Sequence, residues 1–566
     1  MCGNYQIINL TAGKIGMITK KTLFYKVAQV SSSTLLSRIL GLLREVLMAR
    51  YLGAGIFSDA FVTAFKIPNS LRKIFAEGAL SAAMIPTFVE VMKREGKQQL
   101  NSLMTLSFLI VQSVLIALCA LIYFKTDILM RFIVPGWYKL DPAFLSEGQS
   151  LDSFTSKACA LFSSCIPAPQ VAYAISYLHI LIVLIIFLSC SALFAAALQA
   201  VHHFFVPAFS PVLLNGAFIA GILVCMHYGL PVEYLCFFIV CGGLIQVILH
   251  YVMYKKYGFG FGPITKEARE RFKQIVIKFL PCLISMSVME INLFIDTSIA
   301  SFLPKGSTTL IYYADRFMGI PLGVFAIAFS TIMFPYFSRI KTYAPQRLQF
   351  FLFEAVKIIL WIMIPIALVM GFFSYKIYYT LFLSDKFTLA QVVEASWILR
   401  AFLVGLCFAS CNKILLNLYY ALHETIVPLY VCVVASVTNF FLSYYVFMPY
   451  FGATGIALAT TISYAVQTVI YLFFLKYKFG FSFFIPAFFE FLLRYCASLI
   501  AAIIPALLVY FGVMHLFAYA PVTISYYMFN TVLYWFWVGP IVLGMIILLY
   551  MLRKPFKVKS YFLEIV

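Results

Sequence analysis

Runs of about 20 apolar residues recur along almost the whole chain, separated by short clusters of Pro, Gly and charged residues. A run of this length crosses the hydrocarbon core of a bilayer as an α-helix, whereas a transmembrane strand shows about ten residues of alternating polarity. Of the 566 residues, 63% are hydrophobic and 11% are charged. The pattern therefore predicts an all-α polytopic membrane protein and argues against a soluble globular chain.

The apolar runs predict fourteen membrane-spanning helices. They lie near 25–50, 57–90, 101–124, 172–200, 206–228, 233–254, 276–303, 309–337, 354–382, 391–421, 426–448, 453–475, 489–513 and 529–552. Most of the loop Lys and Arg follow even-numbered spans, so the positive-inside rule places both termini in the cytoplasm. Residues 125–171 then form a large external loop, in which Cys159 and Cys165 either pair or stay as free thiols.

Two short motifs occur twice. Ala200-Val201-His202-x-x-x-Val206-Pro207 recurs as Ala421-Leu422-His423-x-x-x-Val427-Pro428, and Ser81-x-x-Met84-x-Pro86-x-Phe88 recurs as Ser330-x-x-Met333-x-Pro335-x-Phe337. Each pair joins spans six apart, which predicts two pseudo-symmetric six-helix lobes in the same orientation around a central cavity, an architecture of transporters. The expected divisions are an N-lobe at 22–256, a cytoplasmic amphipathic linker at 257–275, a C-lobe at 276–480 and two extra helices at 485–553.

Basic residues lie inside the first two apolar spans. Those with long apolar flanks are Arg38, Arg44, Lys66 and Arg72. Charge at bilayer depth is costly unless it faces protein or a water-filled cavity, so these side chains are expected to line the path of an anion. Arg50, Lys73 and Glu90 are instead expected to reach the interface from helix ends. Glu45 shares a helix face with Arg38 and is expected to balance it.

Buried charge returns in the second half of the chain. Asp296 has no basic residue within a helical turn, so it requires a partner from elsewhere, an ion or a proton. One interpretation is a site for a coupling cation, and the other is a structural salt bridge, for example to Arg316. The adjacent Asp315 and Arg316 either neutralise each other or serve separate roles. Arginine suits a phosphate ligand because its planar fork binds two oxygens and stays charged.

Catalytic constellations are missing from the sequence. Apart from the adjacent His202 and His203, the seven His are far apart in the sequence. The thirteen Cys are scattered without a CxxC pair, and HExxH, GxSxG and P-loop motifs do not occur. We therefore expect a transporter with no catalytic residues, no metal site of the His/Cys type and no cofactor. The net charge of +20 lies in loops and between helices rather than in a basic soluble domain, so nucleic acid is not an expected partner.

Several segments together resemble one family. They are SRILGLLRE, ARYLGAGxxSDAF, FKIPNSLRKIFAEGALSAAMIP, AAALQAVHHFFVPAFSPVLLN and ASFLPKGSTTLIYYADRFMGIPLGVF. The chain resembles the MurJ (MviN) lipid II flippases, within the superfamily of multidrug, oligosaccharidyl-lipid and polysaccharide exporters. The resemblance implies transfer of the undecaprenyl-pyrophosphate-linked disaccharide pentapeptide, lipid II, from the inner to the outer leaflet. It also implies the bacterial inner membrane, a role in peptidoglycan synthesis and cell shape, contact with membrane lipids and cell-wall synthesis machinery, and a monomer.

Position by position, the resemblance implies a substrate-binding set. Its members are Arg38, Arg44, Arg72, Arg316, Asp59 and Lys66. It implies coupling to Na⁺, H⁺ or membrane potential, for which Asp296 is the expected cation residue, and a groove for the lipid tail at the last two helices. The sequence departs from the family pattern at Glu45, where Asp is usual, and at Gly319, where Gln or Glu is usual. Two alternatives remain: an exporter of another polyprenyl-linked glycan or of drugs, and a membrane-embedded enzyme acting on polyprenyl phosphates.

Overall fold

The computed structural model describes residues 20–77, 79–140, 165–201, 203–483 and 485–558. The first half contains α1 (Lys20–Leu52), α2 (Ile56–Arg72), η1 (Lys73–Glu77), α3 (Ala79–Arg94), α4 (Gly96–Phe124), α5 (Thr126–Ile133), η2 (Pro135–Trp137), β1 (Tyr138–Leu140), β2 (Cys165–Pro167), α7 (Pro169–Leu181), α8 (Leu184–Ala200), α9 (Phe205–Tyr228) and α10 (Val232–Lys256). The two strands pair antiparallel. Whether Cys159 and Cys165 pair or stay as free thiols lies outside the side chains that the structure describes.

The second half begins with a long helix. Its elements are α11 (Lys266–Ala300), α12 (Ser307–Pro321), η4 (Leu322–Ile327), α13 (Ala328–Tyr343), η5 (Pro345–Arg347), α14 (Leu348–Phe372), α15 (Ser374–Phe382), α16 (Leu389–Ala421), α17 (Ile426–Phe441), η6 (Leu442–Phe447), α18 (Met448–Phe479), α19 (Ile485–Ala518), α20 (Val522–Asn530) and α21 (Tyr534–Leu552).

Ten helical stretches of the described residues are long and apolar enough to cross a membrane. One of them, Ile426–Phe479, covers two expected spans and is broken at Gly452, whose φ of 54° lies in the left-handed region. The expected first, second and seventh spans correspond to α1, to α2 with α3, and to α11. The all-α polytopic fold predicted from the apolar runs is confirmed.

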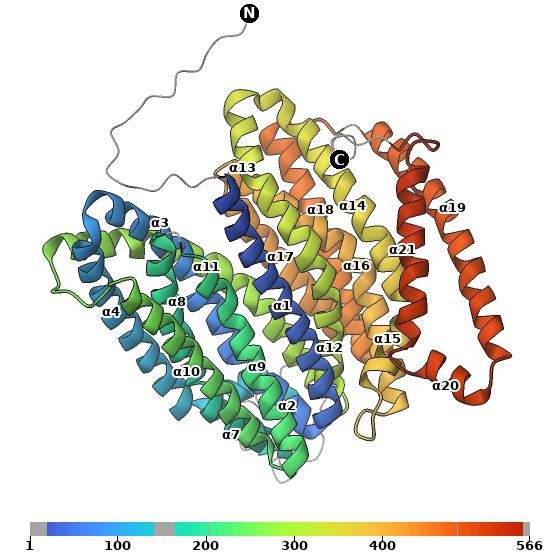
Figure 1. Cartoon of the computed structure of the whole chain (residues 1–566), viewed down its shortest axis with the longest axis horizontal. Helices are drawn as coiled ribbons and strands as arrows, with labels where there is room; N and C mark the ends of the chain where they lie inside the picture. The colour runs from blue at the N-terminus through green and yellow to red at the C-terminus, as the bar shows by residue number, and fades with distance from the viewer. Residues whose placement is uncertain (1–19, 78, 141–164, 202, 484, 559–566) are drawn as a thin grey trace, which may run out of the picture.

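The helices form two groups, which we call the first lobe (α1–α10) and the second lobe (α12–α18). Figure 1 shows the first lobe on one side, the second lobe on the other, and α19 and α21 at the outer edge of the second. The lobes touch where α12 packs against α2 and where α15 packs against α1. Both α19 and α21 expose large apolar side chains such as Leu508 and Phe536, which lipid would cover.

The internal repeat is visible in the backbone. The π-helical segment η1 follows α2, and the π-helical segment η4 follows α12 at the same place in the repeated unit. Likewise α8 and α16 end at the two copies of the Ala-x-His motif. Helix α2 continues through Pro68, so its irregular turn lies in η1 and not at the proline. Turns of this kind are concentrated at functional sites.

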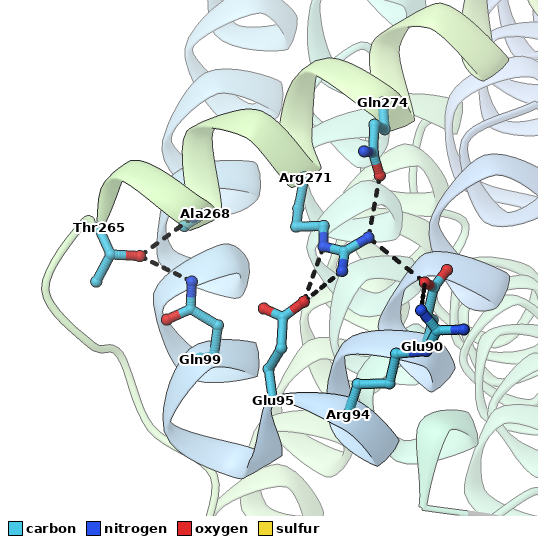
Figure 2. A network of polar contacts seen from close by, with 8 residues as sticks. All are labelled: Glu90, Arg94, Glu95, Gln99, Thr265, Ala268, Arg271 and Gln274. Atoms are coloured by element: carbon cyan, nitrogen blue, oxygen red, sulfur yellow. Dashed lines mark hydrogen bonds and ion pairs between the residues drawn. The ribbon is translucent and has the colours of Figure 1, made fainter.

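Helix α11 ties the two halves of the chain together. Its first turns carry Arg271, whose Nε and Nη2 donate to Glu95 Oε1 at 2.9 and 2.5 Å and whose Nη1 donates to Glu90 at 3.5 Å. Thr265 caps the helix and also accepts from Gln99 Nε2 at 2.8 Å (Figure 2). The basic segment at 266–273 is therefore continuous with the seventh span and bound to the start of α4 and the end of α3.

Candidate functional site

A cavity of about 590 Å³ lies between the two lobes and is rich in arginine. Its lining residues are Thr34, Ser37, Arg38, Gly41, Arg44, Phe65, Asn69, Arg72, Leu184, Leu188, Pro207, Ala208, Pro211, Leu214, Asn215 and Arg316. We call it the arginine cavity. All four arginines that the sequence singled out line it, and none of these lining residues is acidic. Helices α1, α2 and α12 supply them from positions far apart in the sequence.

Arg44 is the most firmly held of the four arginines. Its Nη1 donates to Asn215 Oδ1 at 3.0 Å, its Nη2 pairs with Glu45, and its guanidinium lies 4.9 Å from the Phe218 ring centroid. Glu45 is 4% exposed and also accepts from the Tyr312 hydroxyl at 3.1 Å. The expectation that Glu45 balances Arg38 is wrong, because the Glu45 carboxylate pairs with the neighbouring Arg44.

Arg38 is held by one long contact. Its Nη2 donates to Gly323 O at 3.4 Å, which joins the lobes. A Cβ at Gly323 would lie 2.7 Å from Arg38 Nη1, so glycine permits this close approach. Arg38 thus keeps donors available for a ligand in the cavity. Arg72 is bound within its own helix, where its Nε and Nη2 donate to Asn69 Oδ1 at 3.2 and 3.0 Å.

Arg316 stacks on an aromatic ring. Its guanidinium carbon lies 4.7 Å from the Tyr312 ring centroid, and its Nε is buried without a hydrogen-bond partner. The adjacent Asp315 lines a different cavity, because successive residues of a helix point about 100° apart. The two side chains therefore serve separate cavities.

A second cavity, of about 200 Å³, lies where α2 and α11 meet the helices of the second lobe, and its lining carries both signs of charge. Its charged lining residues are Lys66, Asp296, Asp315 and Lys413. Lys66 donates to Thr297 Oγ1 at 2.7 Å and so reaches across from α2 to α11. Lys66 lines this second cavity and not the arginine cavity.

Asp296 is the first member of a chain of hydrogen-bonded polar groups that lines the second cavity and reaches α17 and α18. Asn439 Nδ2 donates to Asp296 Oδ1 at 2.6 Å. The Asn439 Oδ1 atom in turn faces the hydroxyls of Ser443 and Thr460, at 3.3 and 3.4 Å. The contacts described for Asp296 thus run to α17 rather than to Arg316.

Asp59 lines neither cavity. It is 2% exposed, and its carboxylate accepts from Gly306 N at 2.6 Å and from Thr309 N and Oγ1 at 2.9 and 2.6 Å. These groups form the beginning of α12, where a carboxylate is favoured by free N–H groups and by the helix dipole. Asp59 therefore joins the two lobes at the N-terminal ends of α2 and α12.

Lys73 forms an ion pair with α11. Its Nζ lies 2.9 Å from Glu290 Oε1, and Ser70 Oγ donates to Glu290 Oε2 at 2.7 Å. These contacts connect α2 and η1 with α11, and 37% of the Lys73 side chain stays exposed.

Sequence reasoning missed several polar partners. Asn215, Asn439 and Lys413 lie in apolar helices, and each lines one of the two cavities. The signal that could have found them is a single amide or ammonium group in an otherwise apolar span, the same signal that identified the arginines.

An apolar pocket of about 530 Å³ lies where α14, α16, α19 and α21 meet. Apart from Arg400 and Tyr510, its lining residues are Ala, Leu, Val, Gly, Phe, Ile and Met. The last two transmembrane helices therefore enclose a hollow suited to hydrocarbon.

Comparisons with known proteins agree with one another. The family model described as lipid II flippase MurJ matches residues 48–530. The lipid II flippase of Burkholderia cenocepacia is 30% identical over 455 residues, which cover 79% of this chain and 83% of that protein. The probable lipid II flippase of Haemophilus influenzae is 31% identical over 443 residues, covering 76% and 82%.

Solved structures show the same fold. A lipid II flippase described as inward closed superposes with a TM-score of 0.68 at 25% identity and covers 93% of this chain and 99% of its own. An inward-facing multidrug transporter of the wider exporter superfamily gives a TM-score of 0.62 at 15% identity, covering 78% and 94%, and shares the fold alone. The chain belongs to the MurJ family of lipid II flippases, which are membrane transporters of peptidoglycan synthesis.

Proposed function

We propose that this protein carries lipid II from the inner to the outer leaflet of the bacterial inner membrane, with the pyrophosphate held in the arginine cavity. The observation that carries the proposal is the convergence of Arg38, Arg44, Arg72 and Arg316 on one cavity without an acidic lining residue. Such a site attracts an anion strongly, and bidentate guanidinium contacts suit phosphate oxygens.

The four arginines have different roles in binding the anion. Asn215 and Glu45 hold Arg44 in place before the ligand arrives, which lowers the entropy lost on binding. Arg38, Arg72 and Arg316 supply further donors around the anion. Neutralising the pyrophosphate lowers the cost of carrying it past the middle of the bilayer.

Alternating access follows from the contacts between the lobes. With both termini in the cytoplasm, Asp59 and the start of α12 lie at the external side, where their hydrogen bonds keep the lobes together. The arginine cavity then opens toward the cytoplasm. Rocking of the lobes would break these external contacts and turn the cavity outward.

The hydrocarbon tail would stay in contact with lipid. The apolar pocket between α14, α16, α19 and α21 supports this part of the proposal, because its lining offers almost no polar atoms. A lipid chain held there would move along the side of the second lobe while the head group passes between the lobes. The protein would do this as a monomer, beside the enzymes of cell-wall synthesis.

A coupling cation would bind at the Asp296 carboxylate, which supplies one negative charge in the second cavity. The Asn439 amide presents its Nδ2 to this carboxylate, so Asn439 Oδ1, beside Thr460 Oγ1, would join the site once the amide turns over and would give oxygen ligands for a small monovalent cation such as Na⁺. When bound, the cation would supply positive charge in the second lobe. Asp296, Asn439 and Thr460 would hold α11, α17 and α18 together around it.

Transbilayer movement of labelled lipid II in proteoliposomes tests the proposal. We expect the wild-type protein to speed movement severalfold, faster with a Na⁺ gradient, and the Arg38→Ala/Arg316→Ala variant, reconstituted at equal density, to match empty vesicles. Movement of another polyprenyl-linked glycan but not lipid II would identify a different exporter. Chemical conversion of the lipid would identify an enzyme, and equal rates for both proteins would refute the arginine site.

A further inference from the structure

A polar side chamber of about 320 Å³ lies against the arginine cavity, between α3, α8, α9 and α10. Arg72 lines both hollows, and so do Leu188, Pro207, Pro211 and Leu214. The chamber therefore adjoins the arginine cavity, and Arg72 stands at their common boundary.

His250 lines this chamber with an unpaired ring nitrogen. The side chain is 1% exposed, and its Nδ1 lies 2.8 Å from Ser191 Oγ and 2.9 Å from Gln246 O. Its Nε2 is buried and has no hydrogen-bond partner. In either neutral tautomer Nε2 needs a partner, and leaving such a group unpaired costs about 1–3 kcal/mol. A ligand in the chamber would supply that partner.

The surroundings hold the His250 ring in place. Gln246 is 4% exposed, and its Nε2 donates to Ser210 O at 2.6 Å, which joins α10 to α9. Ser191 on α8 contacts Nδ1, the same ring nitrogen that faces the Gln246 carbonyl. Contacts with α8 and within α10 thus hold the ring at the wall of the chamber before any ligand enters, and fixed groups of this kind favour specific recognition.

The lining indicates the chemistry of the ligand. Arg72 is the one charged residue among the residues that line the chamber, and Ser191, Gln199, Ser210, Gln246 and His250 are neutral hydrogen-bonding groups. Alanine, leucine and proline complete the walls. Such walls suit a group with hydroxyls and amides on a partly apolar ring. The volume is at the lower end of the range for small-ligand pockets, roughly 300–1,000 Å³.

We propose that this chamber is the subsite for the sugar bonded directly to the pyrophosphate, with His250 Nε2 as its hydrogen-bonding partner. The proposal rests on the proposed function, because it takes the pyrophosphate to lie at the arginines. With the anion beside Arg72, the next group of the head reaches the chamber. The arginines recognise the charge, and the chamber distinguishes a glycosylated pyrophosphate from a bare one.

Binding of two lipids by the purified full chain tests this subsite. The probes are lipid II and undecaprenyl pyrophosphate, which lacks the sugars. We expect His250→Leu to weaken lipid II binding about tenfold, as loss of one buried hydrogen bond predicts, and to change undecaprenyl pyrophosphate binding less than about twofold. Arg72→Ala should weaken binding of both lipids.

A second variant tests the chamber without touching the histidine. Ala195→Met fills the chamber from α8 and should reproduce the selective loss of lipid II binding, whereas Ala220→Met on an exposed face of α9 should bind both lipids like the wild type. If His250→Leu does not fold, the Ala195→Met variant alone tests whether the chamber binds the sugar. Unchanged lipid II binding in the folded variants, or equal losses for both lipids, would overturn the subsite. Wild-type protein that binds neither lipid would instead refute the proposed function.

Discussion

At the scale of single residues, the four arginines of the cavity differ in what they hold. Arg44 neutralises the buried Glu45, whereas Arg38 makes one long contact with a backbone carbonyl and is exposed to the cavity. Removing Arg44 therefore disturbs the protein as well as the site. Arg38 is the better probe of anion binding, a distinction that depends on contacts made in the folded protein.

We expect Arg38→Ala to abolish growth support in cells depleted of the native flippase while its abundance and Tm stay near those of the wild type. Arg44→Ala should also abolish function but lower abundance, because a buried carboxylate left without its partner costs about 3–5 kcal/mol. Arg44→Lys should be impaired, since lysine lacks the bidentate fork. Complementation assays with immunoblots check these results, and full growth with Arg38→Ala would contradict the pyrophosphate site.

Asp296→Asn separates a cation site from a structural one. If the Asp296 carboxylate holds a driving cation, the variant should bind lipid II normally yet lose the stimulation of its movement by a Na⁺ gradient. Thr460→Val, which removes a neutral oxygen beside Asn439, should weaken the same stimulation. Lower abundance and Tm for Asp296→Asn, with the stimulation retained, would show that the carboxylate is structural.

At the scale of elements, α2 is a helix that connects the first lobe with α11 and α12. Its first turn caps α12 through Asp59, its middle reaches Thr297 on α11 through Lys66, and η1 after it pairs Lys73 with Glu290. Helix α2 leads into the π-helical η1, where a small change of backbone geometry is available. Motion of the lobes must therefore rearrange contacts along this one helix.

We expect Asp59→Asn to favour opening at the external side, because the neutral amide makes weaker bonds to the start of α12 by about 1–2 kcal/mol. A cysteine placed at the buried Ala54, beside Gly306, should then react several times faster with an impermeant thiol reagent added outside. Asp127→Asn, which breaks the exposed pair with Arg131, is the matched control and should leave the rate unchanged.

A pH-dependent contact joins the segment before α17 to the end of α18. Hydrogen bonding by Lys478 and the backbone N–H groups of Ile426 and Val427 lowers the pKa of Glu424 below its ordinary value of 4.5. A lowered pKa stabilises the folded state above pH 4.5, and this contribution is lost as the pH falls through the lowered pKa.

We therefore expect Glu424→Gln to lower Tm at pH 7 and to match the wild type once the pH falls below that lowered pKa. Thermal unfolding in detergent, repeated across this pH range, measures the gap in Tm between the wild type and Glu424→Gln. In a Lys478→Gln background the gap at pH 7 should shrink, because Lys478 is the main cause of the shift. A gap that widens as the pH falls would contradict this account.

At the scale of the whole molecule, the distribution of loop charge sets the orientation in the membrane. In a cysteine-free background, a cysteine at Lys305 should react with an impermeant reagent in intact cells, and cysteines at Arg269 or Lys341 should react only after lysis. Labelling of Arg269→Cys in intact cells would invert the topology. Gly148 and Lys157, which we also expect outside, lie beyond the described residues.

The sequence by itself determined the all-helical membrane class and showed the internal repeat. These follow from the length and spacing of apolar runs, which act locally along the chain because the bilayer demands about 20 apolar residues wherever it is crossed. It also identified Arg38, Arg44 and Arg72, since charge in an apolar span has to face a polar hollow, and the family resemblance added Arg316.

Only the tertiary structure decided which residues meet. Glu45 pairs with Arg44 and not with Arg38, Asp59 caps α12 instead of lining the arginine cavity, and Asp315 and Arg316 face different cavities. Each outcome depends on the angle at which a side chain leaves its helix, and the contact of Asp59 also depends on a partner 247 residues away. Hydropathy along the chain carries no information about either, so these partners emerge only when the helices pack.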